Sequence, residues 1–249
     1  MVLNHTIEEG QVIRQLDINM FLIVINFFEI AAAIVGTIYI TKYREDHFFR
    51  YFVYFLWFSA FVDTVFGWLP TLIHYTEQFS FLKGTIFSNN QWSYNVFDLI
   101  NFSFYLLFFI HFIDSYKVKK TGVYILIGYI TTSLLNLVFS GKFFEAPMIY
   151  NLISGTLLLI LFIIIYYYRI LQSERILDFY KMMPFYVSVG ALVFHIIVNP
   201  VFIYGEYYNN DKSPEFVQVY RIILTAANIF MYTCYIIGFI VCSRRNKSY

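Results

Sequence analysis

Two carboxylic acids lie near the middle of long apolar stretches, where an ionised side chain is hard to accommodate. Glu29 lies in the first stretch and Asp63 in the second, and counting from the stretch ends places both at a similar depth. An ionised acid at the centre of a membrane-spanning helix costs about 2.5 to 3.5 kcal/mol, so intramembrane acids are usually functional, paired or protonated. His195 is the one basic side chain near this level. We therefore predict a proton-coupling or ion-coupling group of Glu29, Asp63 and His195.

The same acids also allow a purely structural interpretation. Membrane proteins use buried polar side chains to fix helix packing, because hydrogen bonds between helices replace those that water would supply. In that case both acids are neutral and are held by amide or hydroxyl neighbours. The candidate neighbours are Asn26, Thr64 and Asn228.

Further polar residues recur at helical spacing within the apolar stretches. In the last stretch they are spaced four, three, four and three residues apart, at Arg221, Thr225, Asn228, Tyr232 and Tyr235. Because lipid surrounds the bundle, such a face should turn inward and line a polar interior. We predict a ligand-binding pocket, largely in the outer half of the membrane, formed by Trp68, Asp98, Asn101, Asn199, Arg221 and Asn228. We also expect Asp98 and Arg221 to form an ion pair, because either charge alone would be costly there.

Catalytic and metal chemistry is disfavoured by the positions of the histidines. A metal site needs several His, Cys, Asp or Glu ligands that converge at one point. His74, His111 and His195 fall at three different depths, which also argues against a pair of axial haem ligands. The sequence has no phosphate-binding loop and no folded segment outside the apolar stretches that could bind a nucleotide. We therefore predict no metal and no cofactor.

One pattern resembles the CAAX-type intramembrane proteases. Glu45, Asp46 and Arg50 have the spacing acid-acid-x-x-x-Arg, and His195 and Asn199 have the spacing His-x-x-x-Asn. In that family the acids and histidines meet inside the membrane, where a glutamate activates water. Here the two acids lie in a loop between apolar stretches, and the family's Phe-x-x-x-His element is missing. An enzyme is therefore disfavoured.

Seven apolar stretches carry these residues. Crossing a hydrocarbon core of about 30 Å takes roughly 20 helical residues, and each stretch is close to that length or longer. The stretches are Ile18–Ile40, Tyr51–His74, Tyr94–Ser115, Gly122–Ser140, Met148–Ile170, Met183–Tyr204 and Val217–Cys242. Aromatic residues at stretch ends, such as Trp92 and Tyr94, are typical of anchors at the membrane interface.

Composition agrees with a membrane protein. The chain of 249 residues is 59% hydrophobic and 22% aromatic, with only 13% charged residues, which is too apolar for a soluble domain of this length. We predict an all-α integral membrane protein in which residues 1–249 form one seven-helix transmembrane bundle. Its surroundings are the lipid bilayer, and nucleic acid is not expected as a partner.

Positive charge alternates between successive loops and predicts an orientation. One set of loops and the C-terminal tail carries twelve Lys and Arg residues, and the opposite set with the N-terminal segment carries five. Loops rich in Lys and Arg stay in the cytoplasm. The N-terminus should therefore lie outside and the C-terminus inside.

The first three and the last three stretches share features at a nearly constant offset. The matching pairs are Asn26 and Asn151 (offset 125), Asn101 and Asn228 (127), Tyr105 and Tyr232 (127), and Pro70 and Pro200 (130). Such self-similarity predicts an internal repeat, with copies at 18–115 and 148–242 and a linking helix at 122–140. Coincidence is the alternative, because Asn and aromatic residues are abundant in this chain.

This three-plus-one-plus-three plan resembles the small sugar and solute carriers of the SWEET and PQ-loop kind, and the resemblance implies a carrier. The Pro-Gln pair that names the PQ-loop family is absent, since Thr71 follows Pro70 and Val201 follows Pro200. Rhodopsin-like proteins are similar in helix number, but the last stretch lacks the lysine that retinal requires. The composition and the last helix also resemble small multi-span proteins of Bacteroidota, so we expect a bacterial inner membrane.

Two functions fit these features best. The first is a carrier or ligand-binding bundle for a small molecule or ion, in which Pro70 and Pro200 act as hinges. The second is a receptor or accessory subunit that contacts a protein partner through the inner loops at Tyr43–Arg50 and Leu171–Lys181. A lipid-modifying enzyme lacks a catalytic constellation, and a purely structural subunit is a further alternative.

Overall fold

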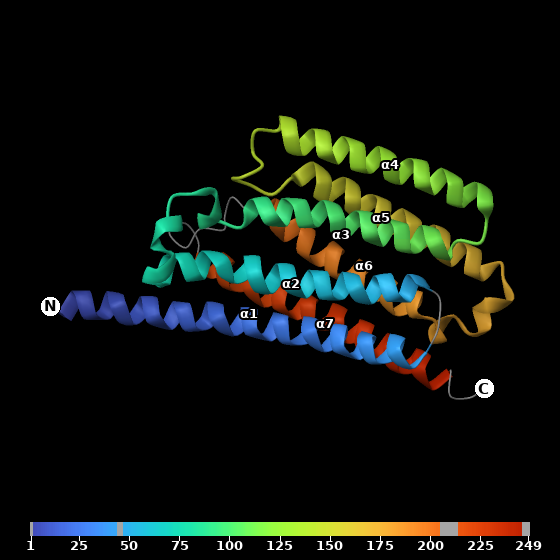
Figure 1. The fold of residues 1–249 in the computed structure, drawn as a ribbon, viewed down its shortest axis with the longest axis horizontal. Coiled ribbons are helices and arrows are strands. Elements are labelled where there is room, and N and C mark those ends of the chain that lie inside the picture. Colours follow the sequence, from blue (N-terminus) through green and yellow to red (C-terminus); the bar gives the residue numbers. More distant parts are fainter. Residues whose placement is uncertain (1, 44–46, 205–213, 246–249) are drawn as a thin grey trace.

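The computed structural model describes residues 2–43, 47–204 and 214–245, and this part of the chain contains helices and loops but no strand. Seven α-helices run back and forth along one axis (Figure 1). Their bounds are α1 Val2–Lys42, α2 His47–Tyr75, α3 Gln91–Phe112, α4 Tyr116–Phe139, α5 Ile149–Leu171, α6 Met183–Ile203 and α7 Pro214–Arg245. We call the end at which α1 begins the N-terminal end and the opposite one the C-terminal end. Short 3-10 helices occupy two loops, at Glu77–Leu82 and Ile86–Ser88 and at Glu174–Leu177 and Phe179–Lys181.

All seven of these helices are long and apolar enough to cross a membrane. The predicted number of spans is therefore confirmed, and the chain is an integral membrane protein. The main difference lies at the helix starts. The apolar part of α1 begins at Met20, but the helix itself begins at Val2, and α4 begins at Tyr116 instead of Gly122. A helix is held by its backbone hydrogen bonds, so it can continue beyond the apolar segment that an inspection of hydropathy detects.

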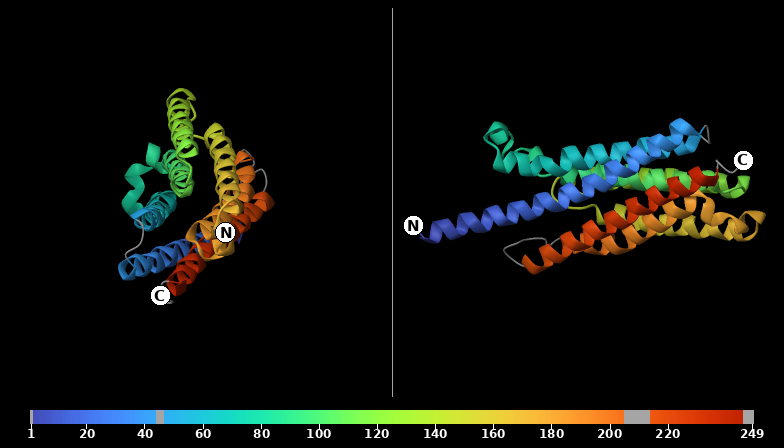
Figure 2. Two further views of the ribbon diagram at one scale, coloured as in Figure 1. Left: turned by 90° about the vertical axis from the view of Figure 1, so that its right-hand side faces the viewer. Right: turned by 90° about the horizontal axis from the view of Figure 1, so that it is seen from below.

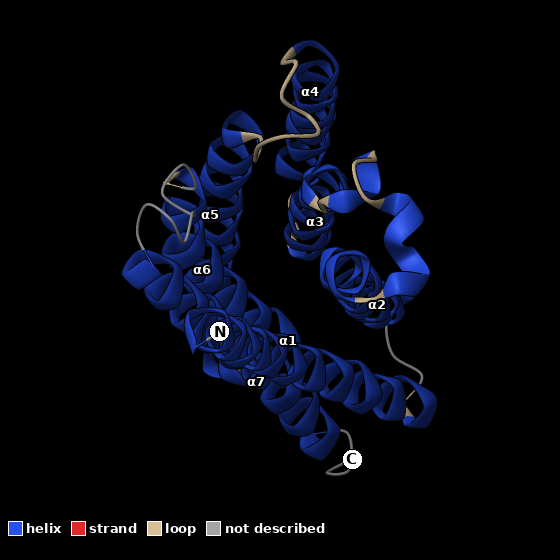
Figure 3. Cartoon of the chain, turned by 90° about the vertical axis from the view of Figure 1, so that its left-hand side faces the viewer, coloured by secondary structure: helices blue, strands red, loops and turns tan. Residues whose placement is uncertain are grey.

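Six of the helices form a ring in the order α1, α2, α3, α5, α6, α7. Each packs against the next, and α7 packs against α1 to close the ring. The remaining helix, α4, packs against α3 and α5 and lies outside the ring (Figures 1 and 3). It is also the least buried of the seven. Figure 2 shows the long α1 beside α7 in the view from below.

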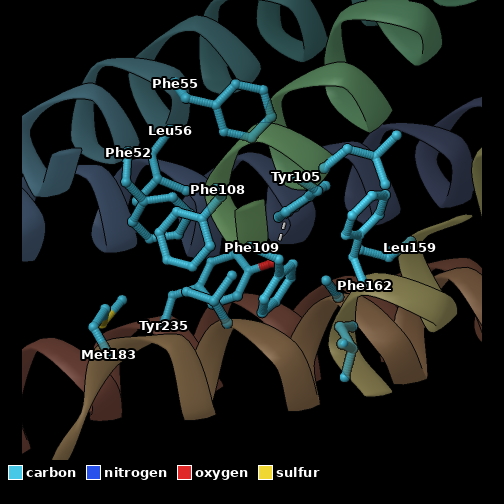
Figure 4. Close-up of a cluster of buried hydrophobic side chains, with 14 of the residues drawn as sticks. Phe52, Phe55, Leu56, Tyr105, Phe108, Phe109, Leu159, Phe162, Met183 and Tyr235 are labelled. Carbon is cyan, nitrogen blue, oxygen red and sulfur yellow. Dashed lines mark hydrogen bonds between the residues drawn. The ribbon is translucent and has the colours of Figure 1, made fainter. Parts of the chain in front are cut away.

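An aromatic cluster fills the ring toward the C-terminal end. Phe52 and Phe55 from α2 face Tyr105 and Phe108 from α3, and Tyr235 enters from α7 (Figure 4). The hydroxyl groups of Tyr105 and Tyr235 are 2.7 Å apart and form a hydrogen bond. These rings are at most 7% exposed, so the interior is solidly packed in this part of the bundle.

Beyond the aromatic cluster, a polar contact joins α1 to α7 at the C-terminal end. The Tyr43 hydroxyl, just after α1, donates a hydrogen bond of 3.1 Å to the backbone carbonyl of Ser243. It accepts one of 3.0 Å from the hydroxyl of the same serine. The first and last helices are therefore tied together on this side.

Close approach of helices depends on glycine at two contacts that concern the site. Gly155 on α5 lies against the ring of Phe102, and a Cβ atom there would come within 2.5 Å of it. Gly190 on α6 lies against α7, where a Cβ atom would be 2.9 Å from the Tyr235 ring and 3.0 Å from the Met231 carbonyl oxygen. Small residues at such positions allow membrane helices to pack tightly.

Candidate functional site: a carboxyl pair beside a polar cavity

Glu29 is fully buried because it lies on the inward stripe of α1. From Met20 onward, where burial is described, the buried positions of α1 follow helical periodicity and are Ile25, Asn26, Glu29, Ala32, Ala33, Gly36 and Tyr39. That stripe packs against α2 and α7. Ala32, Ala33 and Gly36 keep the neighbouring helices close, and Glu29, one turn before Ala32 and Ala33, is 0% exposed.

Asp63 on α2 is the neighbour of Glu29. The two carboxyl groups are close enough to influence each other's charge, and the hydroxyl of Tyr94 on α3 donates a hydrogen bond of 2.9 Å to Oδ1 of Asp63. The side chain of Tyr232 on α7 lies beside Glu29, and Asp98 on α3 is near enough to interact with Asp63. The two acids that the sequence places at one depth therefore lie close together, with tyrosines on both sides.

In the structural interpretation, Asn26, Thr64 or Asn228 would hold the two acids by hydrogen bonds. None of the three forms such a bond in the part of the chain that the structure describes. The amide of Asn228 donates to the Leu224 carbonyl, 2.9 Å away in its own helix, and Thr64 is exposed. Within the described residues, neither carboxyl oxygen of Glu29 has a hydrogen-bond partner. The same is true of the Oδ1 atom of Asn26. Two carboxyl groups in contact can bond to each other only if one of them carries a proton. A proton shared with Asp63 would thus supply the bond that Glu29 lacks.

A cavity of about 50 Å³ adjoins Asp63. At about 10–15 Å³ per molecule it has room for about three to five waters. Its polar lining comes from α2, α3, α6 and α7 and consists of Ser59, Asp63, Asn101, Tyr105, His195, Asn228 and Tyr232. The other lining residues are Phe55, Leu56, Phe97, Phe194 and Met231. The aromatic cluster lies directly on its C-terminal side, since Phe55 and Tyr105 belong to both.

His195 and Asn101 present polar groups to this cavity, and the imidazole of His195 is unpaired among the described residues. The His195 side chain is 3% exposed, and neither of its ring nitrogens has a hydrogen-bond partner among the described residues. Its ring packs on Phe102, with the ring centres 4.6 Å apart. Asn199, one turn further along α6, donates its amide hydrogen to the Thr156 hydroxyl instead. A buried imidazole without a partner is costly, so these groups are available to water or a ligand.

The structure brings together only part of the predicted site. Asp63, Asn101, His195 and Asn228 line the cavity, and Glu29 lies behind Asp63. The cavity lining does not include Trp68, Asp98, Asn199 or Arg221. The polar space is therefore at the level of the carboxyl pair and not at the level of Asp98 and Arg221.

The expected ion pair between Asp98 and Arg221 is not formed. Among the described residues, neither Asp98 nor Arg221 takes part in an ion pair within 4.0 Å. An ion pair does join Lys181 and Asp178, 2.6 Å apart in the loop before α6, and it raises the pKa of the Lys181 ammonium. α3 and α7 are not consecutive in the ring, so they meet across it at a few side chains and not along their length. The hydrogen bond between α3 and α7 joins Tyr105 and Tyr235. On α3, Tyr105 lies about two helical turns beyond Asp98.

Tyr94 is a site residue that the sequence does not single out. At the end of a span it is indistinguishable from an interfacial anchor, yet its hydroxyl binds Asp63. One signal was present: Tyr94, Asp98 and Asn101 are spaced four and three residues apart and therefore share one helix face.

Asn95 is a second missed residue, with a structural role. It is 0% exposed, and its amide donates to the carbonyls of Phe143 (2.8 Å) and Ala146 (3.0 Å). Its Oδ1 accepts a hydrogen bond of 3.1 Å from the backbone N–H of Met148. One side chain thereby fastens the start of α3 to the loop between α4 and α5.

No group of three or more His, Cys, Asp or Glu side chains that could hold a metal ion occurs among the described residues. Glu45 and Asp46, the acids of the protease-like pattern, lie outside those residues. No protein-family model, no curated protein and no solved structure matches the chain. The carboxyl pair and its cavity are therefore the strongest guide to function.

Proposed function

We propose that this protein is a small carrier that binds a small molecule or ion in the cavity between α2, α3, α6 and α7. The observation that carries the proposal is a cavity inside a membrane bundle, lined by polar and aromatic side chains that include the unpaired imidazole of His195. His195 and Asn101 face it, and the Glu29 and Asp63 pair adjoins it. Unpaired polar groups are expensive in a membrane interior, and they usually mark substrate or ion pathways.

The orientation that we propose has the N-terminal end outside and the C-terminal end in the cytoplasm of a bacterium. It is supported by the twelve Lys and Arg residues on one side against five on the other. In this orientation the aromatic cluster and the Tyr43 to Ser243 contact close the cytoplasmic side of the cavity. A carrier must open that side during its cycle.

The proposed repeat of 18–115 and 148–242 gains support from the cavity lining. Asn101 and Asn228 match at an offset of 127, as do Tyr105 and Tyr232, and all four line the same cavity. The ring order is also unchanged when the first three helices are exchanged for the last three, and α4 lies outside the ring. Both features are what two three-helix copies around a central site would produce.

Access to the cavity from the two sides of the membrane tests this function without knowledge of the ligand. Ser59 lines the cavity and is 3% exposed. We replace it by cysteine in a Cys234→Ala, Cys242→Ala background and add a membrane-impermeant thiol reagent to right-side-out and to inverted vesicles. A carrier exposes its site to each side in turn, so we expect labelling of Ser59→Cys in both preparations. Ser133→Cys is the control: Ser133 is buried in α4 outside the cavity lining, and it should stay unlabelled.

The pattern of labelling separates the alternatives. Labelling from the outside only would contradict a carrier and would favour a receptor that binds a ligand from one side. Absence of labelling from both sides would favour a structural subunit with a sealed interior.

A further inference from the structure

The walls of the cavity favour a positively charged occupant. Its ionisable lining groups are Asp63 and His195, with Glu29 behind Asp63. Among the described residues that line it there is no Lys or Arg. A ligand anion would meet acid and the negative faces of aromatic rings, whereas a cation is attracted by both.

Aromatic rings surround the polar groups on several sides. Phe55, Phe97, Phe194 and the two tyrosines Tyr105 and Tyr232 line the cavity. A cation within about 6 Å of an aromatic ring centre gains about 0.5–2 kcal/mol, with the larger values in desolvated sites. The amide oxygens of Asn101 and Asn228 can add ligand contacts, as can a ring nitrogen of His195, which has no partner among the described residues.

Size and ligand number limit the kind of cation. The cavity of about 50 Å³ is far below the roughly 300–1,000 Å³ typical of sites for drug-sized molecules. Divalent cations prefer several carboxylate ligands, and the described residues bring no three His, Cys, Asp or Glu side chains together. A compact monovalent cation fits both limits.

We propose that the ligand is a small monovalent cation and that it displaces one proton held between Glu29 and Asp63. This inference rests on the proposed binding function of the cavity and names its substrate class. Without the cation, the pair holds one proton and one negative charge. When the cation binds in the cavity beside Asp63, the proton leaves, the two negative charges of the pair attract the cation, and the net charge of the site is unchanged. Such an exchange avoids placing an additional charge in the membrane interior.

The groups that face the pair are arranged to support this exchange. From α3, Tyr94 donates its hydrogen bond to Oδ1 of Asp63, and Asp98 lies near the same acid. Tyr232 approaches Glu29 from α7, and His195 faces the cavity from α6. With Tyr94 on one oxygen of Asp63, the other oxygen remains for the shared proton or the cation.

The test uses proteoliposomes with an entrapped pH indicator. Sodium, potassium, guanidinium and tetramethylammonium chlorides are added outside in turn, which separates alkali cations from organic cations, and sucrose at equal osmolarity is the blank. We expect at least one cation to enter and release protons to the outside, so that the internal pH rises. The initial rate should fall at least tenfold in Glu29→Gln and in Asp63→Asn, since each amide keeps the size of the side chain but cannot exchange a proton. Glu145→Gln, an exposed acid in the loop between α4 and α5, should keep the wild-type rate.

A second readout does not depend on transport. Binding to the folded state raises the thermal stability of purified protein in detergent. The cation that drives proton release should therefore raise the Tm of wild type, measured against sucrose at the same osmolarity, and should leave the Tm of Asp63→Asn unchanged. A variant that fails to fold would be recognised by its Tm in the absence of salt, and the wild-type Tm shift alone then tests the cation.

Failure of this inference can be distinguished from failure of the proposed function. If no cation releases protons or shifts the Tm, while Ser59→Cys is labelled from both sides, the ligand is not a cation and the carrier stands. Proton release that persists unchanged in both acid variants would also overturn the inference, because another group must then carry the proton. A cation-dependent Tm shift with one-sided labelling would retain the cation site and contradict the carrier.

Discussion

Single residues decide whether the interior polar groups of this bundle serve binding or structure. Among the described residues, Glu29 and His195 have side-chain atoms without partners at or behind a cavity, whereas Asn95 satisfies its side chain with three hydrogen bonds to the backbone. The first pattern leaves room for a ligand. The second is that of a structural asparagine, although the two kinds of residue look alike in the sequence.

Substitution of Asn95 tests that distinction. Asn95→Ala removes three hydrogen bonds to the backbone, each with a net contribution of about 0.5–1.5 kcal/mol, and leaves backbone groups unpaired. We expect the free energy of unfolding in detergent to fall by about 2–4 kcal/mol. Asn89→Ala is the matched control, because its amide also bonds to this loop, at the Phe144 carbonyl 3.1 Å away, but is exposed. A similar loss in both variants would show that burial does not determine the contribution of these asparagines.

The sequence indicates which polar residues face inward, but not which of them meet. Helical spacing places Asp98 and Arg221 on polar faces at a similar depth, yet their helices are not neighbours in the ring. Depth can be counted along one chain segment, whereas lateral neighbours depend on how all helices pack. For the same reason the contact of Glu29 with Asp63 was easier to predict, because consecutive helices α1 and α2 lie side by side.

At the scale of elements, the apolar stretches predict the helices well because one physical rule governs both. A span must be apolar and about 20 residues long to cross the membrane, and each predicted stretch became one helix. The extension of α1 back to Val2 was not predicted, because that rule applies only to residues inside the bilayer. Contacts between helices depend on finer features, such as the glycine that faces Phe102.

The contact between α3 and α5 provides a prediction at this scale. In Gly155→Ala the new methyl group would lie 2.5–2.8 Å from atoms of the Phe102 ring. Phe102 is 0% exposed and packs on His195, so it cannot move without disturbing the site. We expect a loss of about 1–3 kcal/mol in unfolding free energy, typical of overpacking.

Gly128→Ala on α4 is the control for this substitution. No atom lies within 4 Å of a Cβ atom at that position, and alanine favours the helix over glycine by up to about 1 kcal/mol. Its stability should be equal to or slightly above that of wild type. Equal stability of Gly155→Ala and wild type would mean that α3 and α5 can separate without cost.

On the scale of the whole molecule, the bundle combines a closed part and a polar part. Aromatic packing and the Tyr43 to Ser243 contact close the C-terminal half, while the cavity and the carboxyl pair lie next to this closure on the side of the N-terminal end. The number of spans follows from the sequence alone. The ring order, the place of α4 and the position of the cavity do not, because they arise from packing between segments far apart in the chain.

The functions proposed for this bundle converge on the chemistry of one buried pair, Glu29 and Asp63. Infrared difference spectroscopy of the purified protein observes it directly, since the C=O stretch of a protonated carboxyl group is separate from the bands of carboxylates. We predict one protonated carboxyl band at neutral pH that is lost in Glu29→Gln and in Asp63→Asn and that disappears when the exchanging cation is added. A protonated band that is unchanged in both variants, or a wild-type spectrum without one, would contradict a proton shared between these two acids.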